Sequence, residues 1–186
     1  MWNFTVTDEE GRELQNKGSQ MAKYFLYAAI IHGGIAAFVT FLGAFGDIIG
    51  VLPLAVARVI AGGGPGMWFT VGYVMYTIVG VVATAVTSLF YYYIENVEGK
   101  VYKGAAKPLS WIHLILGNIG VAGASLCAMW GGYYGAVAML PKGATTLNAH
   151  LVLVQVEQPI AAFIGLALIG FFAGGLGYLS MMRSKS

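Results

Sequence analysis

Three histidines are the residues of this 186-residue chain best suited to ligand chemistry, because a neutral imidazole binds haem iron, metal ions and quinone oxygens. His32 lies about eleven residues into an apolar segment, residues 21–45, and His113 lies about one turn into another, residues 109–130. Ionisable side chains inside such segments are rare and are functional candidates by default. The sequence therefore offers His32 and His113 as candidate cofactor-binding residues, for quinone or haem.

The depths of the two histidines decide between these roles. Two imidazoles ligate one haem when they lie at the same depth on facing helices. At 1.5 Å per residue the depths of His32 and His113 differ by roughly 6–10 Å, which disfavours a shared haem. In one alternative, each imidazole hydrogen-bonds a carbonyl of a neighbouring helix. In another, His113, next to Trp111, contacts a quinone or a lipid headgroup.

Other residue types offer less chemistry. His150 and Glu157 are seven residues apart and would share one face of a helix, but two ligands are too few for a structural zinc site. The methionines show no spacing typical of copper sites, and neither a nucleophile elbow nor a phosphate-binding loop is present. The lone Cys127 has no disulfide partner. We therefore predict no catalytic residue, no metal site and no cofactor bound by this chain.

The composition of the chain indicates whether the segments that carry these residues lie in water or in a membrane. Hydrophobic residues make up 58% of the chain and charged residues 10%, and the mean hydropathy is +0.74. Soluble domains carry roughly 25% charged residues, so the chain has too few charges to cover a water-exposed surface. A net charge of +2 gives no reason to expect a nucleic-acid partner. The polar residues 1–20 lack the apolar core of a signal peptide and are expected to form a cytoplasmic N-terminal segment.

Four segments are apolar over the ~20 residues needed to cross a bilayer. They span residues 21–45, 67–94, 109–130 and 160–182. A fifth apolar segment, residues 48–60, is too short to cross and contains Pro53 and Arg58, which favours an interfacial or re-entrant helix. The expected fold is all-α: an integral membrane four-helix bundle forming one domain over residues 21–186, with this short helix between spans 1 and 2.

Basic residues predict the orientation of the bundle. Eight of the ten lysines and arginines lie in the N-terminal segment, the second loop and the C-terminal segment, which four spans place on one side. The positive-inside rule makes that side cytoplasmic, together with both termini. Aromatic residues, which favour membrane interfaces, are then expected at two levels. Tyr91, Tyr92 and Tyr93 would lie at the inner interface, and Trp68, Trp130, Tyr133 and Tyr134 at the outer one.

Small residues recur at helical spacing, which allows helix backbones to approach closely. The examples are Gly33 with Ala37, Gly170 with Gly174, and the series Gly117, Gly120 and Gly123. Packing within the bundle accounts for most of them. The chain nevertheless has 27 glycines, more than four helices need for contact with one another, which favours an additional contact with a partner subunit.

Residues 69–140 also carry a series of motifs that follow one another in a known order. Residues 71–80 read VGYVMYTIVG, the aromatic run FYYY occupies residues 90–93, and the turn GKVY occupies residues 99–102. Residues 109–114, LSWIHL, open the next helix, and the glycine-rich stretches GNIG and GGYYG follow it. This order resembles the last helices of the large catalytic subunit of haem-copper oxidases.

In that family two haem-binding histidines lie where this chain has Tyr73 and Met75, and the copper-binding histidines have no counterpart here. The resemblance therefore implies a degenerate or accessory subunit of a prokaryotic or archaeal terminal oxidase, in the cell membrane. It further implies that haem and copper belong to partner subunits of a respiratory complex. This chain would support assembly and stability and seal lipids, or a quinone, at the contact.

Two other functions are compatible with the sequence. The glycine-rich break at residues 62–66 and the short segment 48–60 are also typical of a small oligomeric transporter or channel, because broken helices line transport sites. A bis-histidine haem electron carrier would use His32 and His113, if helix tilt brought them to one depth.

Overall fold

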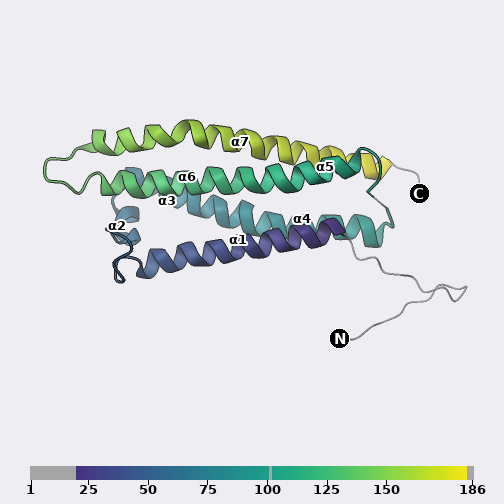
Figure 1. Cartoon of the computed structure of the whole chain (residues 1–186), viewed down its shortest axis with the longest axis horizontal. Coiled ribbons are helices and arrows are strands. Elements are labelled where there is room, and N and C mark those ends of the chain that lie inside the picture. The colour runs from purple at the N-terminus through teal and green to yellow at the C-terminus, as the bar shows by residue number, and fades with distance from the viewer. Residues whose placement is uncertain (1–19, 101, 184–186) are drawn as a thin grey trace, which may run out of the picture.

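The computed structural model describes residues 20–100 and 102–183 as four long helical segments joined by short links (Figure 1). The first is α1, Gln20–Phe45, and the last is α7, Thr146–Arg183. The second runs without interruption over Gly64–Val97, and the third runs over Ala106–Val137. Each of the four is long and apolar enough to cross a membrane, which confirms the predicted all-α four-helix bundle.

The two central segments are composite helices. The second consists of α3 (Gly64–Met75), η1 (Tyr76–Ala83), α4 (Thr84–Tyr92) and η2 (Tyr93–Val97). The third consists of α5 (Ala106–Ile112), η3 (His113–Gly117) and α6 (Asn118–Val137). The η elements are π-helical turns, which are rare and occur frequently at functional sites.

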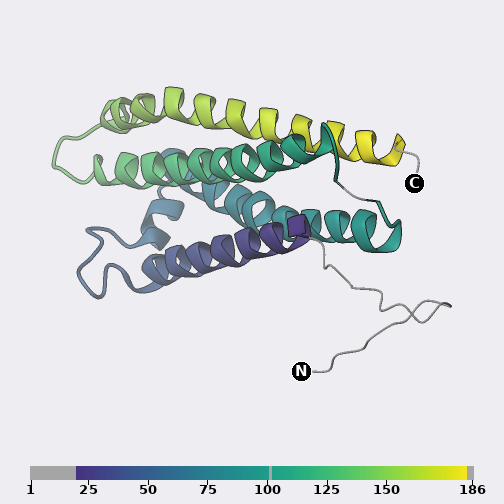
Figure 2. The same cartoon turned by 45° about the vertical axis from the view of Figure 1, so that its right-hand side comes forward.

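Neighbouring segments pack side by side along the length of the bundle (Figures 1 and 2). The most extensive contacts join α6 to α7 and α3, while α1 packs against α4 and η1. We call the end with both described termini and the link between η2 and α5 the basic end (Figure 1). It carries Lys23, Lys100, Lys103, Lys107 and Arg183. The opposite end carries α2 (Val56–Ala61) and the α6–α7 loop.

The helices are longer than the predicted spans. The largest difference is in α7, which begins at Thr146 rather than at residue 160 and continues through Pro159. The predicted span 160–182 begins directly after Pro159, and this start of the fourth helix was therefore wrong. Proline is tolerated inside membrane helices, because side chains, waters and local adjustments satisfy the carbonyl that its missing N–H leaves free.

The short helix predicted between spans 1 and 2 is present as α2, although turns occupy most of residues 46–54. Val59 of α2 is fully buried. The Tyr133 hydroxyl holds the preceding turn: it donates to the Leu54 carbonyl at 2.7 Å and accepts from the Leu54 N–H at 3.0 Å. A Cβ at Gly66 would lie 2.8 Å from the Val59 carbonyl carbon, so the glycine-rich break lets α2 fold back against the start of α3.

Glycine contacts bring the long helices together as predicted. A Cβ at Gly120 would lie 2.6 Å from the Phe163 carbonyl oxygen of α7, and one at Gly72 would lie 2.7 Å from the Ser125 carbonyl oxygen of α6. At such distances only glycine allows the backbones to meet. Gly33 makes a looser contact, because its Cβ would lie 3.9 Å from the Val81 side chain.

Candidate functional site

His32 lies inside the bundle with both ring nitrogens in hydrogen bonds. Its exposed fraction is 6%, and its Nε2 lies 2.9 Å from Oδ1 of Asn118. The other amide atom of Asn118, Nδ2, donates to the Leu114 carbonyl at 2.7 Å, so Oδ1 is the atom that faces His32. Because an amide oxygen only accepts, Nε2 of His32 carries the proton and donates. Nδ1 then accepts from the Tyr76 hydroxyl, which lies 2.9 Å away.

The Tyr76–His32–Asn118 group is closely enclosed. Tyr76 is fully buried, and its ring meets the imidazole edge-on with centroids 5.4 Å apart. A Cβ at Gly80 would lie 3.4 Å from the Tyr76 ring, so this glycine provides the space that the ring occupies. The Thr84 hydroxyl adds a bond of 3.2 Å to Oδ1 of Asn118. His32 can therefore ligate a metal only by giving up one of its two bonds.

His113 forms a second buried tyrosine–histidine pair. Its exposed fraction is 7%, and Nδ1 lies 3.2 Å from the hydroxyl of Tyr91, which is fully buried. The imidazole occupies the space over Gly174, where a Cβ would lie 2.6 Å from the His113 Cε1. Trp111, two residues away, lies on the outside of the bundle beside Tyr24, with ring centroids 5.1 Å apart. The rings of Phe25, Phe171 and Tyr178 pack against the His113 imidazole, and of these only Phe25 is fully buried.

The two pairs occupy successive layers of the bundle. His32 is bonded to Asn118, which follows His113 by five residues, or about 7.5 Å along the helix. This spacing lies within the predicted depth difference. A cavity of about 20 Å³ separates the layers; its polar lining consists of Thr84, Thr87, His113 and Asn118. It has room for about one water molecule within reach of both layers. We call this row of interior polar side chains the polar column; it consists of Tyr76, His32, Thr84, Asn118, His113 and Tyr91.

The π-helical turns explain why these polar groups share one interior face. A π turn brings residues five apart onto the same side of a helix, and η3 places His113 and Asn118 beside the same cavity. Directly after η1, the hydroxyl of Thr84, the first residue of α4, reaches back five residues to the Val79 carbonyl at 3.4 Å. The turns thus aim side chains that a regular α-helix would rotate away from one another.

The column continues towards the basic end as a cluster of three tyrosines and one carboxyl group. The rings of Tyr102 and Tyr178 each lie 5.0 Å from the ring of Tyr91. Burial, together with the neighbouring Tyr91 and Glu95, raises the pKa of the Tyr102 hydroxyl, which therefore stays protonated. Within the described part of the chain, the Tyr102 and Tyr178 hydroxyls and one Glu95 carboxyl oxygen are buried without a hydrogen-bond partner. Such atoms are typically satisfied by ordered water.

Towards the opposite end the interior becomes apolar. Tyr76 packs into a buried cluster with Val56, Val59, Phe69, Met129 and Tyr133. The polar column therefore extends from the basic end to about the middle of the bundle, where this cluster closes it. Chemically, the column can hold water molecules that hydrogen-bond to its hydroxyl, imidazole, amide and carboxyl groups.

Other predicted residues lie apart from the column. His150 and Glu157 are both exposed on α7, in the half of the helix near the opposite end. Tyr73 contacts Thr40, with the two hydroxyl oxygens 2.7 Å apart, and Met75 is exposed. Within residues 20–100 and 102–183, no group of three or more His, Cys, Asp or Glu side chains is arranged to hold a metal ion.

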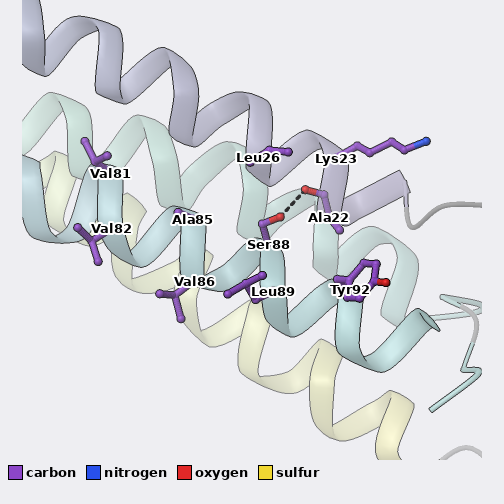
Figure 3. A pocket seen from close by; sticks show the side chains of 10 residues that line it. All are labelled: Ala22, Lys23, Leu26, Val81, Val82, Ala85, Val86, Ser88, Leu89 and Tyr92. Carbon is purple, nitrogen blue, oxygen red and sulfur yellow. Dashed lines mark hydrogen bonds between the residues drawn. The ribbon is translucent and has the colours of Figure 1, made fainter. Parts of the chain in front are cut away.

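An apolar groove opens on the outer surface between α1 and the helix formed by η1 and α4 (Figure 3). Its volume is about 620 Å³. It is lined by Ala22, Lys23, Leu26, Val81, Val82, Ala85, Val86, Ser88, Leu89 and Tyr92. The Ser88 hydroxyl donates to the Ala22 carbonyl at 2.8 Å, so this polar group joins the two helices.

Sequence reasoning identified both histidines but missed their partners. Tyr76, Thr84 and Asn118 are uncharged residues within the apolar spans, and the sequence assigns Tyr91 to the inner interface. The available signal was a polar residue inside a span at a fixed distance from a histidine, such as Asn118 five residues after His113.

Comparisons with protein-family models, with curated proteins and with solved structures found no match to this chain. The resemblance to haem-copper oxidases consequently rests on the motifs of residues 69–140 alone. The function is inferred from the arrangement of the chain's own residues.

Proposed function

We propose that the chain is a non-catalytic membrane subunit of a prokaryotic respiratory electron-transfer complex, a terminal oxidase, which it helps to assemble and stabilise. The supporting observation is how little of each span this chain covers by itself. In the most apolar window of each span, only 22% to 33% of the residues are buried inside the chain. The remaining surface is available to lipids and to partner subunits.

Part of that surface is suited to contact with another helix. A Cβ at Gly34 of α1 or at Gly175 of α7 would meet nothing within 4 Å, so the bundle itself does not require glycine there. Ala37, three residues after Gly34, is also exposed. Small residues on membrane helices allow close contact between backbones, whereas contact with lipid does not require them.

The histidine geometry supports placing the haem and copper in partner subunits. Both nitrogens of His32 are in hydrogen bonds, and His113 lies in a different layer. The oxidase resemblance agrees, since Tyr73 and Met75 occupy its haem-ligand positions. Lipids, or a quinone, would then fill the contact between this chain and the redox subunit.

After gentle detergent extraction from its native membrane, we expect this chain to copurify with a haem-containing partner. Replacing His32 or His113 with glutamine should leave the haem content and visible spectrum of the complex unchanged, because neither imidazole ligates iron in this proposal. Mass spectrometry and absorption spectroscopy of the purified complex measure both quantities. Recovery of the chain without a haem-bearing partner would contradict the assignment. Loss of one haem per complex with either substitution would instead favour the electron carrier.

The orientation also has a direct test. The positive-inside rule places the basic end in the cytoplasm, together with both termini. A reporter active only outside the cytoplasm should be silent when fused after Ser186 and active when inserted in the α6–α7 loop, at residues 142–145. Enzyme activity of the two fusions in intact cells measures the difference. The reverse pattern would overturn the orientation.

A further inference from the structure

We propose that the groove between α1 and the η1–α4 helix binds one hydrocarbon chain of an anionic membrane lipid, with the lipid headgroup at Lys23. This inference deepens one part of the proposed function, the contact with lipids or quinone. Its test uses the isolated chain, so it can fail while the assignment to a respiratory complex stands, and the reverse also holds.

The length of the groove matches one leaflet of a bilayer. Its lining extends from Val81 to Tyr92, eleven residues along one helix, which corresponds to about 16 Å. The hydrocarbon core of a bilayer is ~30 Å thick, so one leaflet contributes ~15 Å. A lipid chain that starts at the basic end therefore fills the groove along its full length.

The width of the groove favours a lipid chain over a helix. A volume of about 620 Å³ spread over that length gives a mean cross-section of roughly 40 Å². An α-helix with its side chains is about 10 Å across and occupies roughly 80 Å². A helix from a second copy or from another subunit would therefore rest on the rim of the groove, whereas a hydrocarbon chain fits inside it.

The lining changes in character along the groove (Figure 3). Val81 and Val82 lie at the inner end, and the Lys23 and Tyr92 side chains lie at the basic end. The middle is apolar apart from Ser88, whose hydroxyl donates to the Ala22 carbonyl. An amphiphile with its apolar chain inwards and its polar group at the basic end matches this order.

The positive charge of Lys23 at the basic end of the groove determines which lipid headgroup is favoured. Lys23 is exposed near the start of α1, and its side chain lies at the basic end of the groove (Figure 3). In the proposed orientation its ammonium group is at the level of the lipid headgroups. A lysine can lay its alkyl chain along apolar surface while its ammonium group stays in water, where it attracts phosphate oxygens. Two acidic residues lie near the end of the second helix. Glu98 lies 3.7 Å from Lys100, which offsets its charge, and Glu95 belongs to the interior tyrosine cluster, where one of its carboxyl oxygens is buried. Lys23 therefore favours an anionic lipid over a zwitterionic one.

Native mass spectrometry of the detergent-purified full chain tests this inference. Phosphatidylglycerol and phosphatidylcholine with identical acyl chains are titrated separately, and a short-chain ubiquinone is added as a competitor. We expect one phosphatidylglycerol to bind more tightly than phosphatidylcholine. Lys23→Gln should weaken phosphatidylglycerol binding about five-fold, the effect of one cationic side chain at a membrane surface, and leave phosphatidylcholine binding unchanged. Ala85→Phe, which fills the groove, should abolish binding of both lipids.

Two matched variants show whether these effects are local. Lys107→Gln removes a charge from the same end outside the groove, and Ala162→Phe adds the same ring to an exposed position on α7. Both should bind phosphatidylglycerol normally, and helical content by circular dichroism confirms that all variants are folded. Equal binding of the two lipids, or equal effects of Lys23→Gln and Lys107→Gln, would overturn the anionic-lipid site. Displacement of the lipid by ubiquinone, or a dimer abolished by Ala85→Phe, would also overturn it, by assigning the groove to a quinone or a second copy.

Discussion

Replacing Gly120 with leucine is expected to separate α6 from α7 and to destabilise the bundle strongly. The added side chain would begin 2.6 Å from the Phe163 carbonyl oxygen and 2.7 Å from the Ala167 Cα, both of which belong to the α7 backbone. Backbone atoms cannot rotate away, so the helices must move apart. We expect a loss of about 3 kcal/mol or more, which corresponds to a melting temperature lower by roughly 10 °C.

The control is Gly175→Leu on α7. A Cβ there meets nothing within 4 Å, so the purified chain should melt within a few degrees of the unmodified one, as surface exchanges usually do. The measurement is thermal unfolding of both variants in the same detergent. Gly175 also belongs to the surface proposed for a partner, so its variant should lose partner protein on copurification while keeping its own stability. Equal melting of the Gly120 and Gly175 variants would mean that α6 and α7 do not meet at Gly120.

Replacing His32 with leucine is expected to produce the second large effect. The change leaves the Tyr76 hydroxyl without an acceptor and removes one donor from Asn118, both inside the bundle. An unsatisfied buried polar group costs about 1–3 kcal/mol, so we expect a total loss of roughly 2–4 kcal/mol. Unfolding of the purified chain in a denaturant series measures it.

A double-mutant cycle with Tyr76→Phe separates the hydrogen bond from packing. Phenylalanine at position 76 has no hydroxyl that needs an acceptor. His32→Leu should therefore lower the stability less in the Tyr76→Phe background than in the unmodified chain. The expected coupling is about 1 kcal/mol, within the range found for hydrogen bonds in membrane proteins. Strictly additive losses would show that the Tyr76–His32 contact contributes no hydrogen-bond energy.

Features that depend on hydropathy and on local sequence could be predicted. The number of spans, the short helix between the first two and the difference in depth between His32 and His113 all follow from counting residues along apolar segments. The close contact at Gly120 follows from the helical spacing of small residues. These inferences need no knowledge of which helix lies beside which.

Features that depend on helix rotation could not be predicted. The sequence places Tyr91, Tyr92 and Tyr93 together at the inner interface and does not distinguish among them; in the structure Tyr91 is fully buried in the bundle, while the other two are exposed. Successive residues of a helix point in different directions around its axis, so three adjacent tyrosines do not share one environment. The sequence likewise does not reveal that Tyr133, placed at the outer interface, turns inwards and hydrogen-bonds to Leu54.

The polar column could not be predicted from the sequence, for a related reason. Hydropathy averages over a window, and isolated Asn or Thr residues among apolar neighbours barely change the average. Which of them face inwards depends on the three π turns, since each turn shifts the register of every residue that follows it. No simple residue pattern marks where the chain makes such a turn, so the alignment of Thr84, His113 and Asn118 emerges only in three dimensions.

The length of α7 has a mechanical consequence. Its 38 residues measure about 57 Å, whereas a bilayer with its headgroups is about 40–45 Å thick. At the usual helix tilt of about 20°, roughly 9–14 Å must extend past the headgroups, and because Arg183 lies at the basic end, the excess emerges at the other. Ala149 and Val156 are buried against the rest of the chain, so packing holds the first turns of α7 in place. Soluble proteins on that side of the membrane would meet an ordered helical surface at a fixed height above the lipid.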